Sequence, residues 1–165
     1  MPNIQFSDNK IDTLIAAPKH LPTDYRRRLS NPRARAYSAQ HEEAQLEVSL
    51  ETDETFRIIL RKSRINPLDF SVILGYMPRE RLKIFRLRRY NGFHANQHTN
   101  KLEGNSFRGF HIHYATERYQ VAGWDEDGYA QETDRYSTID GALEALLGDC
   151  HFIRPDQERL QARMF

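Results

Sequence analysis

Between residues 42 and 124, apolar and polar positions alternate along much of the chain. A period of two is typical of β-strands that bury one face, and turn-forming pairs such as Asn66-Pro67 separate the alternating runs. In the fourth run the apolar parity changes after Ile84, which indicates a β-bulge or burial on both faces. The pattern predicts strands over residues 42–50, 56–60, 70–76, 81–90, 110–114 and 119–124.

Residues with helical spacing lie on both sides of this segment. Ser7 is placed to cap a first helix, in which apolar residues gather on one side. After the sheet, Ser137 with Asp140 three residues later is similar to a capping box and begins a second apolar stripe. The spacing predicts helices over residues 7–17, 24–29 and 137–150, and a short one from residue 155 onward.

These elements predict one domain of the α+β class, in which an antiparallel meander of about six strands has helices packed on one face. A chain of 165 residues is long enough to bury a core of this kind. The domain would have three parts: a helical basic N-terminal arm (1–40), an antiparallel sheet (41–124) and C-terminal helices (137–165).

Composition indicates the class of protein and the cellular compartment to expect. Hydrophobic residues make up 39% of the chain, and aromatic residues 11%, which is typical of a globular protein. The single cysteine, Cys150, excludes an internal disulfide and suits a reducing compartment. No apolar run approaches the roughly 20 residues of a membrane helix, and the first ten residues lack a signal peptide's apolar region. We therefore expect a cytoplasmic protein with no membrane association.

The net charge of +1 conceals an uneven distribution of charge along the chain. Residues 57–90 carry ten Lys and Arg against two acidic residues, whereas residues 119–165 carry four against ten. A dense basic block indicates an anionic partner, most plausibly RNA, although its cations would pair with the acidic C-terminal part if this is only a solvated sheet face. The candidate phosphate-binding residues are Arg57, Arg61, Lys83, Arg86, Arg88 and Arg108.

Histidines are concentrated in residues 91–123, which hold four of the seven in the chain. Within the predicted strand 110–114, His111 and His113 alternate with Phe110, Ile112 and Tyr114. Because successive side chains of a strand point to opposite faces, burial of the apolar set would place both imidazoles on the opposite, more open face.

Two histidines on one open face suit metal-free cleavage of RNA, which requires a base for the 2′-hydroxyl and an acid for the leaving oxygen. In this interpretation His111 and His113 are the acid–base pair. Either Arg118 or Arg108 contacts the phosphate, and a base stacks on Tyr119, Tyr90 or Phe93. The chain would then be a ribonuclease-like protein that needs no cofactor.

Metal binding is an alternative use of the same region, because imidazole ligates zinc, iron, copper and nickel. The order His-x-His-x3-Glu followed by Gly123 is similar to the first metal motif of cupin barrels. The spacings to Gly104 and Gly123 each differ from that motif by one residue, and a later glycine-rich strand with a further histidine is lacking. The candidate ligands are His94, His98, His111, His113 and Glu117.

Residues 55–152 also resemble a family of uncharacterised small bacterial proteins that share a G-x-H-x-H strand after a long loop. Besides this strand, which begins at Gly109, the resemblance rests on Phe93-His94, Tyr119 and the 137–150 helix. In size and layout these proteins are similar to the toxins of bacterial toxin–antitoxin modules. The resemblance implies an RNA-directed role, but no established activity comes with it.

Three hypotheses about function therefore follow from the sequence. The first is an RNA-acting enzyme, such as an endoribonuclease-like toxin, that uses the histidine pair. The second is a non-enzymatic module that binds a protein or a nucleic acid, such as an inhibitor or an antitoxin-like binder. The third is a small metal-binding enzyme. The oligomeric state stays open in all three.

Overall fold

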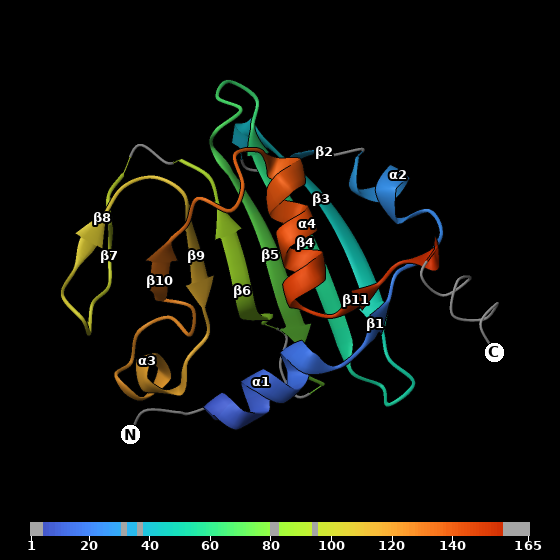
Figure 1. Ribbon diagram of the computed structural model, residues 1–165, viewed down its shortest axis with the longest axis horizontal. Helices are drawn as coiled ribbons and strands as arrows, with labels where there is room; N and C mark the ends of the chain where they lie inside the picture. The colour runs from blue at the N-terminus through green and yellow to red at the C-terminus, as the bar shows by residue number, and fades with distance from the viewer. Residues whose placement is uncertain (1–4, 31–32, 36–37, 80–82, 94–95, 157–165) are drawn as a thin grey trace.

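A single twisted antiparallel sheet organises the computed structural model (Figure 1), which describes residues 5–30, 33–35, 38–79, 83–93 and 96–156. The order of the seven strands in this sheet is β10-β9-β6-β5-β4-β3-β2. Their bounds are Arg33–Arg35 for β2, Ser38–Ser49 for β3, Thr55–Ser63 for β4, Phe70–Met77 for β5, Phe85–Asn91 for β6, His111–Tyr114 for β9 and Tyr129–Glu132 for β10.

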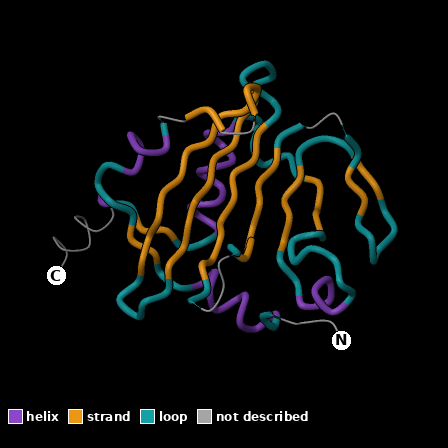
Figure 2. The backbone as a smooth tube through the Cα atoms, turned by 180° about the vertical axis from the view of Figure 1, so that it is seen from behind, coloured by secondary structure: helices purple, strands orange, loops and turns teal. Residues whose placement is uncertain are grey.

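Helices α1 (Asp8–Ala16), α2 (Tyr25–Leu29) and α4 (Ile139–Asp149) contribute to one core on one face of this sheet (Figure 1). Seen from behind, the strands face the viewer and α4 lies beyond them (Figure 2). The buried residues that join the helices to the sheet include Ile11, Leu14, Leu29, Leu46, Ile58, Val72, Leu74, Ile112, Leu146 and Leu147. One face of the sheet is therefore packed on helices, and the other carries most of the polar and charged positions of the same strands together with the buried Ile59 and Ile73.

Two small strand pairs complete the fold. Near the ends of the chain, β1 (Lys19–His20) pairs in parallel with β11 (Phe152–Ile153). Beside β9 and β10, the hairpin of β7 (His98–Thr99) and β8 (Ser106–Phe107) stands at the edge of the molecule (Figure 1). This hairpin comes from the long loop that the sequence places before the histidine strand.

The predicted α+β fold is confirmed, with helices on one face of an antiparallel sheet. Five of the six predicted strands correspond to β3, β4, β5, β6 and β9. The predicted bulge lies in β6, where Leu74 and Gly75 pair with Arg88 and Arg86 and leave Leu87 as the extra residue. The extra residue allows both Leu87 and Tyr90 to be buried.

The predicted sixth strand, over residues 119–124, is wrong. These residues begin within a short helix, α3 (Glu117–Val121), because the Thr116 hydroxyl accepts a hydrogen bond from the main-chain N of Tyr119 and caps the first turn. The edge strand next to β9 is β10 instead. The cap of α4 is also one residue later than predicted, since Thr138 and not Ser137 accepts from the N of Gly141.

Helices α1 and α2 are parts of the core and do not form a separate arm. Ser7 caps α1 as predicted, by accepting a hydrogen bond from the N of Lys10. The helix expected after Pro155 falls largely on residues 157–165, outside the described part of the chain. No helix among the described residues is long and apolar enough to cross a membrane.

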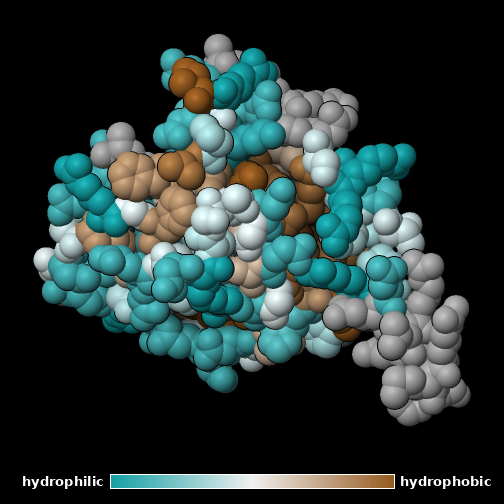
Figure 3. Space-filling view, turned by 45° about the horizontal axis from the view of Figure 1, so that its top comes forward, coloured by the Kyte–Doolittle hydropathy of each residue, from teal (hydrophilic) through white to brown (hydrophobic). Residues whose placement is uncertain are grey.

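Apolar residues reach the surface in the middle of the face shown in Figure 3, and hydrophilic residues surround them.

Two pockets, of about 450 and 630 Å³, are lined by residues of α2, α4 and the β3–β4 region. Neither pocket is lined by any of the histidines of the 91–123 segment.

Candidate metal centre

Strand β9 carries His111 and His113 between two neighbours, β6 and β10. Across β6, His113 pairs with Arg89 and His111 pairs with Asn91. Because Ile112 lies in the core on the helix-covered face, the two imidazoles extend from the opposite face, as their parity predicts. The shared face is therefore confirmed.

The expectation that this face is open is wrong for both histidines. His111 is 5% exposed and His113 is 3% exposed. The β7–β8 hairpin covers them: the ring of His98 stacks 5.4 Å from that of His111 and lies edge-on 4.8 Å from that of His113. Phe107, from β8, places its ring 5.5 Å from that of His111. The pair is thus enclosed by a segment that precedes it in the chain.

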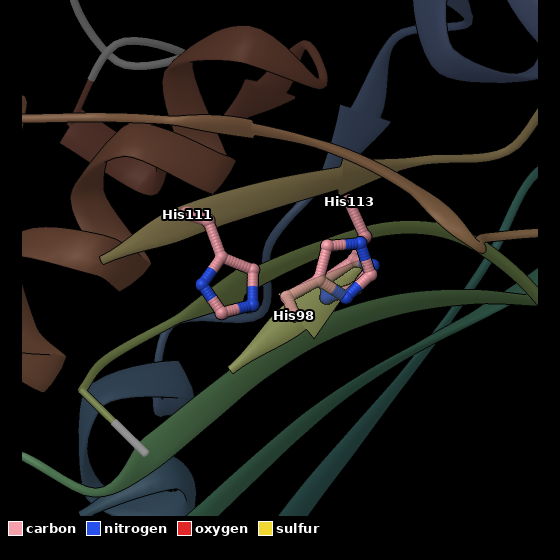
Figure 4. A group of neighbouring side chains, drawn as sticks. All are labelled: His98, His111 and His113. Carbon is pink, nitrogen blue, oxygen red and sulfur yellow. The ribbon is translucent and has the colours of Figure 1, made fainter. Parts of the chain in front are cut away.

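The three imidazoles converge on one point (Figure 4). One ligating nitrogen from each of His98, His111 and His113 lies within 4.8 Å of the other two. Of the other predicted ligands, His94 lies outside the described residues, and Glu117 does not belong to this group. The main-chain N of Glu117, at the start of α3, donates instead to the carboxylate of Asp8.

Backbone carbonyls determine the tautomers of both strand histidines. Nδ1 of His111 lies 2.7 Å from the carbonyl O of Gly109, and Nδ1 of His113 lies 2.7 Å from that of Asp127. A carbonyl oxygen only accepts, so each neutral ring must carry its proton on Nδ1. Each Nε2 is then an acceptor nitrogen, as in metal-ligating histidines whose second nitrogen is held by an outer partner, and Nε2 of His111 lies 3.3 Å from Nδ2 of Asn91.

Asn100 determines the tautomer of His98. Its side-chain amide pairs with the main chain of Ala130 in both directions, accepting from the N at 2.9 Å and donating to the O at 2.9 Å. These bonds define which amide atom is the oxygen, and that Oδ1 lies 2.8 Å from Nε2 of His98. Nε2 of His98 is therefore the protonated nitrogen, and Nδ1 keeps the lone pair.

A fourth polar side chain, Asn91 of β6, borders the group. It is 2% exposed, and its Nδ2 lies 3.3 Å from Nε2 of His111. Its Oδ1 has no hydrogen-bond partner within the described part of the chain. Buried polar atoms of folded proteins are almost always paired, so an orphan amide beside three imidazoles points to an additional ligand.

Electrostatics keep His113 neutral. Burial lowers the pKa of His113 far below its usual value, and the Arg89 cation and the neighbouring histidines lower it further. A neutral imidazole is the form that binds a metal. The same shift removes the proton that a general acid would donate, so the acid–base pair receives little support from His113.

Beside His113, an acidic turn docks on the sheet. Asp127 is fully buried, and its carboxylate lies 3.1 Å from Nε of Arg89 and 3.3 Å from a terminal nitrogen of Arg86. Glu126 also pairs with Arg86, at 3.4 Å. These ion pairs hold the turn in place, and with it the carbonyl of Asp127 that orients His113.

The other two residues of the predicted catalytic set contact different partners. Arg118 forms an ion pair with Glu103 at 2.7 Å and lies over the ring of Tyr129 at 4.6 Å. Tyr119 is fully buried, and its hydroxyl donates to Glu103 at 2.6 Å. Both residues anchor the loop of the β7–β8 hairpin to α3 and are not among the groups that meet the imidazoles in the described contacts.

Most cations of the predicted phosphate-binding set already have partners. Arg57 pairs with Glu47 at 2.5 Å, and Arg61 pairs with Glu43 at 2.7 Å. Arg88 lies over the ring of Tyr114, while Lys83 and Arg108 are exposed. This pattern corresponds to the alternative of a paired sheet face, except that the carboxylates paired with Arg57 and Arg61 come from β3 and not from the C-terminal part.

Several residues of the centre were missed in the sequence. Arg89 and Asn91 share a parity on a predicted strand and flank the buried Tyr90, so their common face was available from the pattern. Asn100 and the carbonyl of Asp127 carry no such signal, because they meet the histidines only through long-range folding.

Comparison of the chain with protein-family models, curated proteins and solved structures finds no match in any of the three. The resemblance to small toxins therefore stays a prediction, and the chemistry of the centre follows from its geometry.

Proposed function

We propose that this chain is a metal-dependent enzyme in which His98, His111 and His113 bind one divalent transition-metal ion. The observation that carries this proposal is the convergence of three imidazoles whose second nitrogens are each held by a hydrogen bond. These hydrogen bonds fix the tautomer of each ring and leave one acceptor nitrogen on each that can bind an ion.

The spacing is close to that of a coordination sphere. Tetrahedral zinc, with metal–nitrogen distances of about 2.0–2.1 Å, separates its ligands by about 3.3 Å. In the structure Nε2 of His111 lies 3.3 Å from Nδ2 of Asn91, a hydrogen bond that an ion bound to Nε2 would displace. The imidazoles, which lie within 4.8 Å of one another, would draw together by about 1.5 Å around an ion.

The number of ligands favours catalysis over a purely structural role. Structural zinc sites are usually closed by four protein ligands, whereas catalytic sites use three and keep a position for water or substrate. When bound, the ion would supply a Lewis acid. The chain's own residues hold it, orient the imidazoles through Gly109, Asn100 and Asp127, and exclude water with Phe107.

The metal-independent ribonuclease stays a prediction with less support, because the histidines are buried and most of the basic side chains are paired. The non-enzymatic binding module also stays a prediction. No observation on the described residues favours a flat binding patch over the enclosed centre.

Cobalt binding tests the proposal. Protein freed of metal is titrated with Co²⁺, and one equivalent should bind and give the visible absorption of a nitrogen-ligated ion. Replacing His98, His111 or His113 with Ala should each reduce Co²⁺ affinity by at least tenfold. His20→Ala, at an exposed position on β1, is the matched control and should bind like the unmodified protein. Absence of stoichiometric Co²⁺ binding by the folded protein would contradict the proposal.

A further inference from the structure

Arg89 is the charged residue nearest in register to the proposed metal ligands. It pairs with His113 across β6 and β9, and directly opposed residues of neighbouring strands lie on the same face of a sheet. Its charge acts on His113, whose pKa is lowered first by burial and then by this guanidinium. The Arg89 side chain is 26% exposed, so it connects the enclosed imidazoles with solvent.

Arg89 is incompletely satisfied by the protein. Its Nε is buried and makes no well-aligned hydrogen bond within the described residues, although the Asp127 carboxylate lies 3.1 Å away. Arg86 shares that carboxylate, at 3.3 Å. Burial lowers the pKa of Arg89, and the neighbouring cations Arg86 and Arg61 add to this in opposition to Asp127.

A charge count shows what a bound ion would lack. The three imidazoles are neutral donors. The nearby guanidinium groups of Arg86 and Arg89 are already matched by the carboxylates of Glu126 and Asp127. Asp125, whose exposed carboxylate lies 3.8 Å from Arg86, supplies one further negative charge. A divalent ion would therefore bring at least one positive charge that the centre does not compensate, in surroundings of low dielectric constant where an unpaired charge is costly.

We propose that the metal centre takes a substrate bearing an oxyanion group, a carboxylate or a phosphate, which bridges the ion and the Arg89 guanidinium. This inference rests on the proposed function. One oxygen of such a group fits the open position on the ion, and a second accepts from Arg89, whose planar fork matches carboxylate and phosphate. A neutral substrate would leave the charge of the ion uncompensated.

The test uses the full chain loaded with one equivalent of Co²⁺ and titrated with inorganic phosphate or, separately, with sodium acetate. We expect at least one of the two anions to shift the visible absorption of Co²⁺ saturably. The anion that binds more tightly shows whether the centre prefers a phosphate or a carboxylate. Arg89→Gln should weaken that anion's affinity at least tenfold while Co²⁺ still binds.

The controls separate this inference from the proposed function. Arg64→Gln is matched to Arg89→Gln, because Nε of Arg64 lies 3.1 Å from Glu42 just as that of Arg89 lies 3.1 Å from Asp127. It should leave anion affinity unchanged. If Arg89→Gln is unable to fold because Asp127 loses its partner, a second variant is used. The double variant Arg89→Gln/Asp127→Asn, which removes both charges, is then tested in place of the single variant.

The outcomes are distinct. A protein that binds no Co²⁺ contradicts the proposed function itself. A protein that binds Co²⁺ but shows no spectral response to either anion overturns the oxyanion inference alone. A folded, Co²⁺-loaded Arg89 variant that keeps full affinity for the anion would likewise overturn the oxyanion inference alone.

Discussion

At the scale of single residues, the orientation of His98 depends on one side chain. Asn100 is 1% exposed, and it is held by Ala130 before it meets the imidazole. Because both amide atoms are committed to the main chain, Asn100 cannot rotate to donate to His98. It therefore presents Nδ1 of His98, and never Nε2, to an incoming ion.

Replacing Asn100 tests this orienting role. Asn100→Ala should reduce Co²⁺ affinity by about 10–100-fold, the usual effect of removing the outer partner of a ligating histidine. It should also lower the free energy of unfolding by about 1–3 kcal/mol, because the buried groups of Ala130 lose their partner. Asn9→Ala, on the exposed side of α1, is the control. Unchanged Co²⁺ affinity in the folded Asn100 variant would rule out the orienting role.

The parity of His111 and His113 was sufficient to predict their common face, because alternation in a strand is a local property. Their burial was not predictable in the same way. The cover comes from His98 and Phe107, which lie in a loop without hydrophobic periodicity. Only the docking of that loop on the sheet shows that the imidazoles are enclosed and grouped.

At the scale of elements, regular alternation identified the strands. Where the predicted elements were wrong, at residues 119–124 and at the start of α4, the cause was a local helix cap. Apolar residues alternate along β3, β4 and β5, so their positions followed from the sequence, although Ile59 and Ile73 are also buried on the face away from the helices. Residues 119–124 contain too few alternating positions to distinguish a strand from a helix, and the Thr116 cap selects the helix.

A buried lysine joins the elements at the two ends of the chain. Lys19 of β1 is fully buried, and its Nζ donates to the carbonyls of Ile15, Ala17 and Cys150, each at 2.8 Å. These carbonyls belong to the C-terminal ends of α1 and α4, where backbone oxygens lack helical partners and a cation is favourable. Lys19 therefore ties both helices to the β1–β11 pair.

Removing this ammonium should destabilise the protein. We expect Lys19→Met to lower the free energy of unfolding by about 2–4 kcal/mol, since it leaves buried carbonyls without a donor. Lys10→Met, at an exposed position of α1, should change it little. Urea denaturation followed by circular dichroism measures both. Equal stability of the two variants would show that Lys19 is not a structural cap.

The difference in unfolding free energy between the unmodified protein and Lys19→Met should depend on pH in a defined direction. Burial lowers the pKa of Lys19 to about 8, below its value of about 10.5 in the unfolded chain. Between these values the unfolded chain binds more protons, so the Lys19 contribution to stability increases with pH from about pH 8 upward. Measurements at pH 8 and 9 avoid the opposing effect of Cys150, whose pKa burial raises from 9 to about 11. The stability difference between the unmodified protein and Lys19→Met should widen over this interval.

At the scale of the whole molecule, the two edges of the fold are held differently. Near β3, the helices and the sheet share a continuous apolar core. At the other edge, the β7–β8 hairpin has strands of only two residues and is joined to the rest by polar contacts. The three imidazoles lie between this hairpin and the sheet, so a bound ion would connect the hairpin to strand β9.

Metal binding should therefore stabilise the whole chain, and His98 should be required for it. An ion that binds only the folded state adds about 2.7 kcal/mol at a free concentration of 100 times Kd. For a chain of this size, that corresponds to an increase in Tm of about 5–10 °C. Calorimetry with and without Zn²⁺ should show this increase for the unmodified protein and for His20→Ala. His98→Ala should melt near the temperature of the metal-free protein and gain nothing from Zn²⁺, because the hairpin is then no longer linked to the sheet. A full Zn²⁺-dependent increase in His98→Ala would mean that the hairpin supplies no ligand.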